Sequence, residues 1–247
     1  ICEGKTMKHK ILYIMLILIF PLHASAQPGI RIGYTNSTHV LRTDQEKKMM
    51  SADGMTAGLT YDFRLHKDTY LRTGLMYGFQ WYSDSYSHDV SLGPDKTSGI
   101  NANEHLIEHN LHLPVFLRHE IEMIPQILSF TMSLGPTISY GLSSETEIAM
   151  FGALDAGFRY DNYNGNMEYT YFPYDDAVKE VMNEEFRKAG MLQKRSDLSM
   201  GGSIGLNIIR QIELEIGYDL GLMNRYRDQK DMFYRRNSFR FTLSYIF

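Results

Sequence analysis

The feature that most constrains this chain is a period of two in its apolar residues. In LSFTMSLGPTISYG, residues 128–141, Leu128, Phe130, Met132 and Leu134 alternate with serine, threonine and glycine. Successive side chains of a β-strand point to opposite faces, so the segment predicts a strand with one apolar face and one polar face. Such strands can form a soluble barrel with the apolar faces inside, or a membrane barrel with those faces against lipid.

Eight segments show this alternation, and connections of two kinds join them. Tight turns join the second segment to the third, the fourth to the fifth and the sixth to the seventh, whereas the other connections are long. Short turns at one end and long loops at the other are typical of outer-membrane barrels. We therefore predict an all-β fold, an eight-stranded antiparallel up-and-down transmembrane β-barrel. Its strands are expected at residues 29–35, 54–65, 69–82, 105–121, 128–141, 197–209, 211–222 and 238–247.

The third long connection, residues 142–196, carries a helical pattern near its end. Pro173 and two aspartates stand at the head of PYDDAVKEVMNEEFRKAG, and Gly190 comes where a helix would end. The apolar residues between them recur on one helical face, which predicts a short amphipathic helix in the third extracellular loop. This loop either folds back over the mouth of the barrel or docks a partner, and its polar aromatic run Asp161–Tyr174 is a candidate recognition segment.

The polar faces of the segments indicate that they line a narrow, enclosed space. An eight-stranded barrel has a lumen just wide enough to be filled by side chains, so crowded positions need small residues. A strand face in water has no such need. Glycine occupies many of the polar positions: Gly58, Gly74, Gly78, Gly201, Gly205, Gly217 and Gly221.

The charged residues of these faces predict ion pairs inside the barrel. After Gln27, every lysine falls in a predicted loop or turn, whereas the strand faces carry arginine. The planar guanidinium of arginine binds carboxylates through two parallel hydrogen bonds, which suits enclosed pairs. We predict an ionic network that fills the lumen, formed by Arg31, Asp62, Arg64, Arg72, Glu108, Arg118, Glu120, Glu213, Glu215, Asp219 and Arg240.

Aromatic residues gather near the ends of the segments. Membrane barrels carry aromatic girdles at both water–lipid interfaces, whereas a soluble sandwich would place these rings centrally. One predicted girdle contains Tyr61, Phe63, Tyr245 and Phe247, and the other contains Phe79, Trp81, Tyr140 and Phe239.

The start of the sequence predicts export. Lys8, His9 and Lys10 precede the apolar run ILYIMLILIF, and Ala24-Ser25-Ala26 follows it. A basic start, an apolar core and an A-x-A site are the parts of a cleaved secretory signal peptide, whereas a membrane anchor needs about 18 or more apolar residues. We predict upstream residues plus a signal peptide over 1–26, cleavage before Gln27, and a barrel domain over 27–247. The only cysteine, Cys2, lies before the predicted cleavage site.

Four stretches resemble one known family. LHLPVFLRHE (111–120), LGPTISYGL (134–142), LEIGYDLGLMN (214–224) and the terminal SFRFTLSYIF are similar to strands of the small eight-stranded outer-membrane β-barrel domain of Gram-negative bacteria, often called the porin family. The resemblance implies an outer-membrane location, with Tyr245 and Phe247 as the signal that the outer-membrane assembly machinery reads. The long connection 142–196 departs from the family pattern, in which this loop is often shorter.

Signals for chemistry are few in the sequence. His105 and His109 share a strand face but lie roughly 13 Å apart along it, too far to bind one metal ion. Neither a glycine-rich phosphate loop nor zinc-ligand spacing occurs. Some outer-membrane barrels are lipid-modifying enzymes that use a histidine with a serine or glutamate near the outer leaflet; His109 and Ser139 could be fitted to that role, although no motif selects them. We expect no enzyme, no metal and no cofactor.

The resulting functional expectation is a non-enzymatic outer-membrane barrel with an occluded polar lumen and long surface loops, in a structural, adhesive or envelope-assembly role. Its expected partners are outer-membrane lipid, the assembly machinery, and an extracellular ligand or protein. A net charge of −4 gives no electrostatic support for a nucleic-acid partner. Two alternatives stay open: a soluble periplasmic lipocalin-like binding barrel, and the lipid-modifying enzyme.

Overall fold

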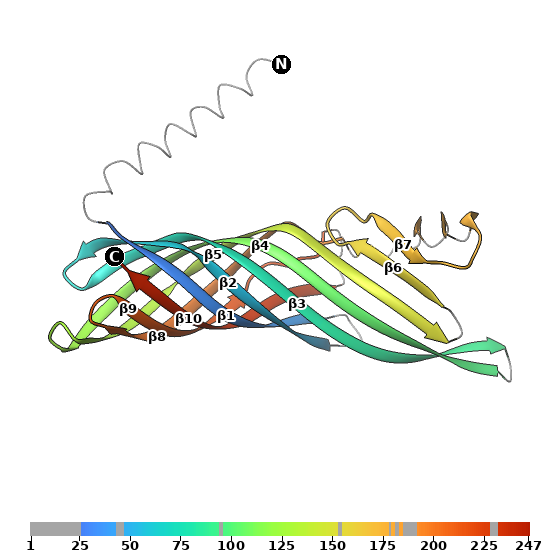
Figure 1. Cartoon of the computed structure of the whole chain (residues 1–247), viewed down its shortest axis with the longest axis horizontal. Helices are drawn as coiled ribbons and strands as arrows, with labels where there is room; N and C mark the ends of the chain where they lie inside the picture. Colours follow the sequence, from blue (N-terminus) through green and yellow to red (C-terminus); the bar gives the residue numbers. More distant parts are fainter. Residues whose placement is uncertain are drawn as a thin grey trace, which may run out of the picture.

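The computed structural model describes residues 26–42, 47–93, 96–152, 155–177, 179–180, 183–184, 192–227 and 232–247. Within them the chain forms one antiparallel sheet (Figure 1). Its strands are β1 (Ala26–Arg42), β2 (Lys47–His66), β3 (Thr69–Gly93), β4 (Lys96–Ile124), β5 (Leu128–Gly152), β6 (Ala156–Asp161), β7 (Met167–Tyr171), β8 (Ser196–Ile208), β9 (Ile212–Gly221) and β10 (Phe233–Ile246).

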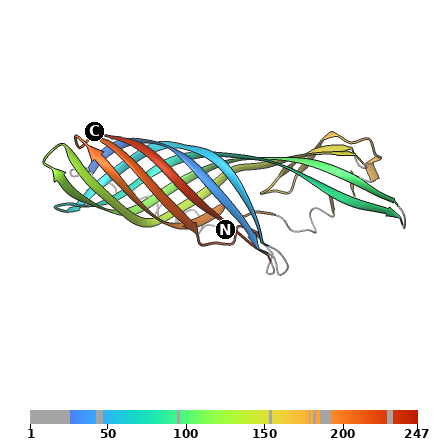
Figure 2. The same cartoon turned by 90° about the horizontal axis from the view of Figure 1, so that it is seen from below.

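Eight of these strands close into the predicted barrel. The ring runs β4-β3-β2-β1-β10-β9-β8-β5, and pairing of β5 with β4 closes it. Each pairing within the ring is antiparallel; Ile32 of β1, for example, lies opposite Leu243 of β10 and Ala57 of β2. The N-terminal half of β5, from Leu128 to Tyr140, pairs with β8, and its C-terminal part, from Glu145 to Met150, pairs with β6 instead. The β3–β4 hairpin and the sheet β5-β6-β7 therefore project beyond the ring (Figures 1 and 2).

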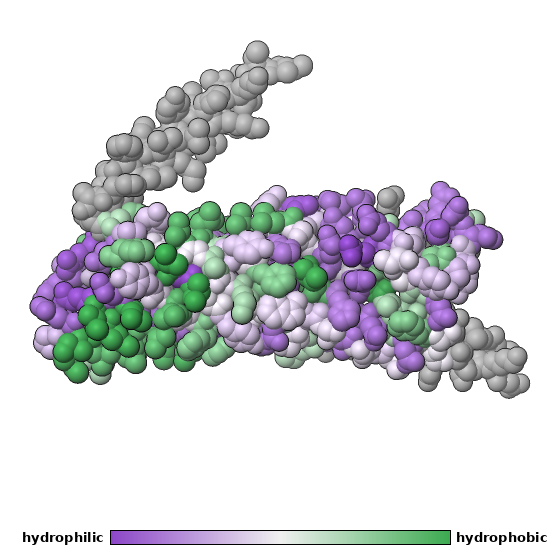
Figure 3. Space-filling view, in the orientation of Figure 1, coloured by the Kyte–Doolittle hydropathy of each residue, from purple (hydrophilic) through white to green (hydrophobic). Residues whose placement is uncertain are grey.

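The apolar strand faces point outward. Leu214 and Leu243 are 37% and 40% exposed, whereas Arg72 and Glu215 on the opposite faces are 1% and 2% exposed. Hydrophobic residues gather on the barrel wall toward the end with the tight turns, and hydrophilic residues cover the end with β6 and β7 (Figure 3). The lipocalin-like alternative is therefore wrong, because the apolar faces do not form an inner cup.

Two of the predicted loops turn out to be mostly strand. β1 and β2 pair as far as Arg42 and Lys47, and β3 and β4 pair as far as Gly93 and Lys96. Beyond the apolar belt the outward positions become serine and asparagine, so the alternation of apolar and polar residues disappears from the sequence. Cross-strand hydrogen bonds continue there, from Ser85 to Asn103 at 2.9 Å and from Ser87 to Asn101 at 2.7 Å.

The aromatic residues lie where girdles were predicted. The rings of Tyr61 and Phe63 lie 6.5 Å apart, and those of Tyr245 and Phe247 lie 5.2 Å apart. Both pairs flank the start of β1, because Tyr61 is opposite Pro28 and Tyr245 is opposite Ile30. Farther along β3, toward the long loops, Phe79 and Trp81 form a pair at 5.2 Å.

Two predictions fall mainly on residues outside the described ranges. The signal peptide lies over 1–26, of which only Ala26 is described, and the helix predicted over 173–190 includes several residues that are not described. Both stay predictions. Within the described ranges, no helix has the length and hydropathy needed to cross a membrane.

The outward apolar belt predicts a large penalty for a charge at its centre. Ile216 faces outward on β9, between Ile204 of β8 and Phe241 of β10. Ile216→Arg should lower the free energy of unfolding in lipid vesicles by about 2–4 kcal/mol, the cost of arginine near the midplane of a bilayer. Urea titration of the vesicle-inserted protein measures it. Ser85→Arg, on the polar outer face of β3, is the matched control and should change stability by less than about 0.5 kcal/mol. Equal effects of the two substitutions would contradict the lipid-facing assignment.

Candidate functional site: the barrel lumen and its outer mouth

An ionic cluster fills the lumen near the tight turns. We call it the turn-side cluster, and it comprises Arg31, Asp62, Arg72, Arg118, Glu120, Glu213 and Glu215. All except Glu120 are at most 3% exposed. Taken from water singly, each charge would carry a desolvation penalty of several kcal/mol, so the cluster depends on mutual pairing.

Glu213 is the centre of this cluster. Its carboxylate oxygens lie 2.5 Å from Arg72 Nη1, 3.0 Å from Arg118 Nε and 3.6 Å from Arg31 Nη2. Arg31 also binds Glu215 at 2.8 Å, and Arg72 binds both carboxylate oxygens of Asp62 at 2.6 and 2.7 Å. The cluster thus joins strands from opposite sides of the ring.

The strand register explains why these side chains meet. Asp62 and Arg72 are direct cross-strand partners on β2 and β3. Arg31 of β1 and Glu213 of β9 both lie opposite Ser244 of the intervening β10, so they share one row of the sheet. Alternation on β9 then places Glu215 on the same inner face as Glu213, one row farther in.

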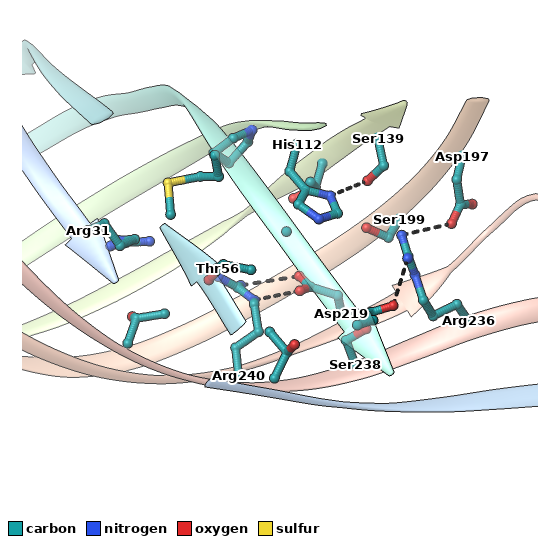
Figure 4. A pocket seen from close by; sticks show the side chains of 17 residues that line it. Arg31, Thr56, His112, Ser139, Asp197, Ser199, Asp219, Arg236, Ser238 and Arg240 are labelled. Atoms are coloured by element: carbon teal, nitrogen blue, oxygen red, sulfur yellow. Dashed lines mark hydrogen bonds and ion pairs between the residues drawn. The ribbon is translucent and has the colours of Figure 1, made fainter. Parts of the chain in front are cut away.

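A cavity of about 70 Å³, lined mostly by polar residues, lies next to this cluster in the middle of the lumen (Figure 4). Arg240 and Asp219 form an ion pair at its wall, with Arg240 Nε 2.5 Å from Asp219 Oδ2. His112 Nδ1 lies 2.8 Å from Ser139 Oγ on another side. Glycines make room for these groups: a Cβ atom on Gly201 would lie 1.7 Å from Asp219 Oδ1. The cavity is roomy and polar enough for water, which needs about 10–15 Å³.

A second cluster closes the lumen on the side of the long loops. We call it the loop-side cluster, and it comprises Glu108, Asp197, Arg225, Arg236, Gln80 and Tyr163. Arg225 forms a short ion pair with Glu108, and Arg236 Nη1 lies 3.2 Å from the other oxygen of that carboxylate. Arg236 also reaches Asp197 at 3.4 Å and donates to Gln80 at 3.1 Å.

Tyr163 enters the mouth of the barrel from the turn between β6 and β7. Its hydroxyl donates to Glu108 at 3.3 Å, and Arg195 lies 4.5 Å from the centre of its ring. Gly141 makes this possible, since a Cβ atom there would overlap the phenol oxygen. Burial, and then the charge of Glu108, raise the pKa of Tyr163 above its ordinary value, so the phenol stays a donor.

Backbone hydrogen bonds hold the loops over this cluster. The segment 192–195 crosses between the two outer loops: Gln193 donates to the carbonyl of Asn162 at 2.7 Å, and Lys194 donates to that of Arg225 at 2.6 Å. Arg227 donates back to Leu192 at 2.8 Å. The mouth is therefore covered by described parts of the third and fourth long connections.

The structure places most of the predicted network in the lumen but divides it. The predicted residues other than Arg64, Glu108, Asp219 and Arg240 form the turn-side cluster, Asp219 and Arg240 flank the cavity, and Glu108 belongs to the loop-side cluster. Arg64 is the exception. It is exposed at the turn-side opening and donates to the carbonyl of Lys67 at 2.7 Å, because β2 ends there.

Sequence reasoning missed most of the loop-side cluster. Arg225, Arg236 and Tyr163 fell in predicted loops, and Asp197 and Gln80 were strand residues without an assigned partner. One signal was available for Arg236: counting back from Arg240 in steps of two keeps it on the inner face of an extended β10.

The structure does not bring His109 and Ser139 together. His109 lies on the outer face, where Nδ1 contacts the hydroxyl of Tyr77, whereas Ser139 points into the lumen and pairs with His112. Among the described residues, no three histidine, cysteine, aspartate or glutamate side chains come together in a way that could hold a metal ion.

The solved structures that resemble this chain are membrane β-barrels. No protein-family model matches the chain. No curated protein matches it. Ail, the attachment invasion locus protein of Yersinia pestis, is 14% identical, with a TM-score of 0.30 over 90% of this chain and 99% of that one. Neisserial surface protein A is 8% identical, with a TM-score of 0.35 over 88% and 97%. The translocator domain of autotransporter NalP from Neisseria meningitidis is 12% identical, with a TM-score of 0.27 over 99% and 98%.

Because these TM-scores are all below 0.5, the fold assignment rests on the strand register of this chain and on which strand faces are buried. The chain is an eight-stranded transmembrane β-barrel of the outer-membrane type. Its ring is closed, its outer wall is apolar, and its two ionic clusters are enclosed. Membership of the porin-family domain stays a prediction, since no family model matches.

The position of Glu213 predicts a large effect of removing its charge. Glu213→Gln leaves Arg31, Arg72 and Arg118 buried without their shared carboxylate, and breaking such a buried group costs about 3–5 kcal/mol. Urea titration of the protein in detergent micelles measures the change. Glu122→Gln is the control: its pair with Arg210, at 3.1 Å, has side chains 44% and 62% exposed, so the loss should be about 0–1 kcal/mol. A loss at Glu213 no larger than at Glu122 would contradict the central place of this carboxylate.

Proposed function

We propose that this protein is a non-enzymatic outer-membrane barrel that does not conduct solutes and acts through its outer surface. The observation that supports this most is the pair of ionic clusters that fill the lumen on both sides of the cavity. An eight-stranded barrel leaves room only for side chains, and here those side chains bind one another. The loops held over the mouth add a further barrier.

The outer end of the molecule carries the features expected of a binding surface. The sheet formed by β3 to β7 rises beyond the apolar belt and presents a polar outer face (Figures 1 and 3). Exposed aromatic side chains lie on its last strands and the segment that follows: Phe151 is 52% exposed, Tyr171 58% and Tyr174 37%. Loops on a rigid scaffold are where recognition concentrates, and this supports an adhesive or structural role at the cell surface.

Export and assembly belong to the same proposal. The segment predicted as a signal peptide would deliver the chain to the periplasm, with cleavage before Gln27. Tyr245 and Phe247 would then be read by the outer-membrane assembly machinery. Two observations are in keeping with this: both rings face outward, at 44% and 65% exposure, and the N–H of Phe247 bonds the carbonyl of Pro28 where the last strand meets the first.

No observation favours the lipid-modifying enzyme. The histidine–serine pair that the lumen does contain, His112 and Ser139, faces the enclosed cavity and not the lipid. His109, which does face outward, is held by Tyr77 and packs against Phe79 with the ring centres 5.1 Å apart. Absence of catalysis remains part of the proposal.

Single-channel recording in planar bilayers tests the occluded lumen. The unaltered protein should give no steady conductance. Variants that remove a central ion pair from one cluster, Arg72→Ala with Glu213→Ala or Arg236→Ala with Glu108→Ala, should also give no conductance, because the other cluster still blocks the lumen. The fourfold variant should conduct. Heat-modifiable migration on a gel confirms that each variant is folded, and steady channels from the unaltered protein would contradict the proposal.

A further inference from the structure

A second cavity, of about 110 Å³, lies outside the loop-side cluster at the mouth of the barrel. Four tyrosines from different parts of the chain line it: Tyr82 of β3, Tyr160 of β6, Tyr234 of β10 and Tyr226 of the fourth long connection. Glu104 of β4 and Gln193 complete its polar lining. Glu104 and Tyr226 are only half-buried, so the cavity has an opening to solvent on their side.

The described residues that line this cavity are rich in aromatic rings and carry no positive charge. Glu104 is the one carboxylic acid among them, and they include neither lysine nor arginine. The guanidinium of Arg225 lies 5.6 Å from the ring centre of Tyr234, one of the lining residues, and is already paired with Glu108. An anion in this cavity would be repelled by the Glu104 carboxylate, and no cation among the described lining residues would offset that repulsion.

Two donor groups of the lining already donate within the protein, and one acceptor has no partner. Tyr82 already donates its hydroxyl to Glu104, and the amide of Asn162 donates to Ser144 and Thr146 at 3.0 and 2.9 Å. Gln193 is 7% exposed, and its Oε1 is buried without a hydrogen-bond partner. A buried acceptor left unpaired is destabilising, so a hydrogen-bond donor from a ligand would relieve this penalty.

We propose that this cavity binds a primary ammonium group on a short alkyl chain. Glu104 and Gln193 Oε1 would accept its hydrogen bonds, and the tyrosine rings would supply cation–π attraction. Leu106 and Ile148 line the same cavity and suit the alkyl part. A neutral sugar fits less well, because it brings no positive charge to pair with the Glu104 carboxylate. The assignment rests on the proposed surface-binding function and names the chemical class of its ligand.

Binding of matched probes tests this site. The whole protein in detergent micelles, labelled with ¹³C in its tyrosine rings, is titrated with n-butylammonium chloride and with n-butanol, which has the same alkyl chain without the charge. Butylammonium should shift the tyrosine signals saturably. Butanol should bind at least about tenfold more weakly than butylammonium. Equal binding of the two probes, or no binding of butylammonium, overturns the proposal.

Two variants check the residues assigned to the site. Glu104→Gln should weaken butylammonium binding by about tenfold or more, and Glu145→Gln, an exposed acid on the outer face of β5, should leave it unchanged. Equal effects of the two variants overturn the role of Glu104. If Glu104→Gln does not fold, the comparison of butylammonium with butanol still decides.

The source of the ammonium group is distinguished by a third probe. Nα-acetyl-lysine amide should bind more tightly than butylammonium if the natural ligand is a lysine side chain of a polypeptide, and more weakly if it is a free amine. If the protein does not conduct and does not bind butylammonium, only the ammonium site is overturned. If the protein conducts, the proposed function is overturned, and the binding experiment still decides the ammonium site.

Discussion

The shared contact of Glu213 with Arg31, Arg72 and Arg118 is the interaction on which this structure most depends. A closed ring of eight strands leaves an interior that must be filled by side chains, and lipid on the outside takes the apolar ones. The polar faces must therefore satisfy one another inside. Around Glu213, arginine side chains pair with the carboxylate at distances of 2.5 to 3.6 Å. Serine and glycine at neighbouring inward positions leave room for these large side chains.

The same constraint organises the rest of the lumen. A second set of arginines and acids gathers around Glu108, and a cavity remains between the two clusters. The long loops pack over the mouth of the barrel. Tyr163 enters the mouth next to Gly141, and the segment 192–195 forms backbone hydrogen bonds within the third connection and to the fourth. The ammonium site proposed at Tyr82, Tyr160 and Glu104 lies in this outer layer, where solvent can reach it. The two ionic clusters thus occupy the lumen, whereas the proposed binding site lies in the outer layer.

How much could be read from the sequence depended on whether residues alternate in polarity. Where lipid lies on one side and the lumen on the other, as at Leu214 and Glu215, the period of two gave the strand, its face and its ionic role. Above the belt both faces meet water or loops, so Ser85, Ser87 and Asn103 carried no such contrast and their strands were taken for loops. Arg236 was missed for the same reason. Tyr163 was missed because it lies in the turn between β6 and β7, where no strand pattern applies, and Arg64 was misplaced because β2 ends just after it.

The central claim is the inversion of faces, and oxygen accessibility of spin labels along β9 tests it most directly. Nitroxide labels placed one at a time at positions 212 to 219 of the vesicle-inserted protein report contact with lipid through collisions with oxygen. Positions 212, 214, 216 and 218 should be accessible, and positions 213, 215, 217 and 219 should be shielded. The reverse pattern, or equal accessibility at both sets, would contradict a barrel with its apolar residues in lipid and its ion pairs inside.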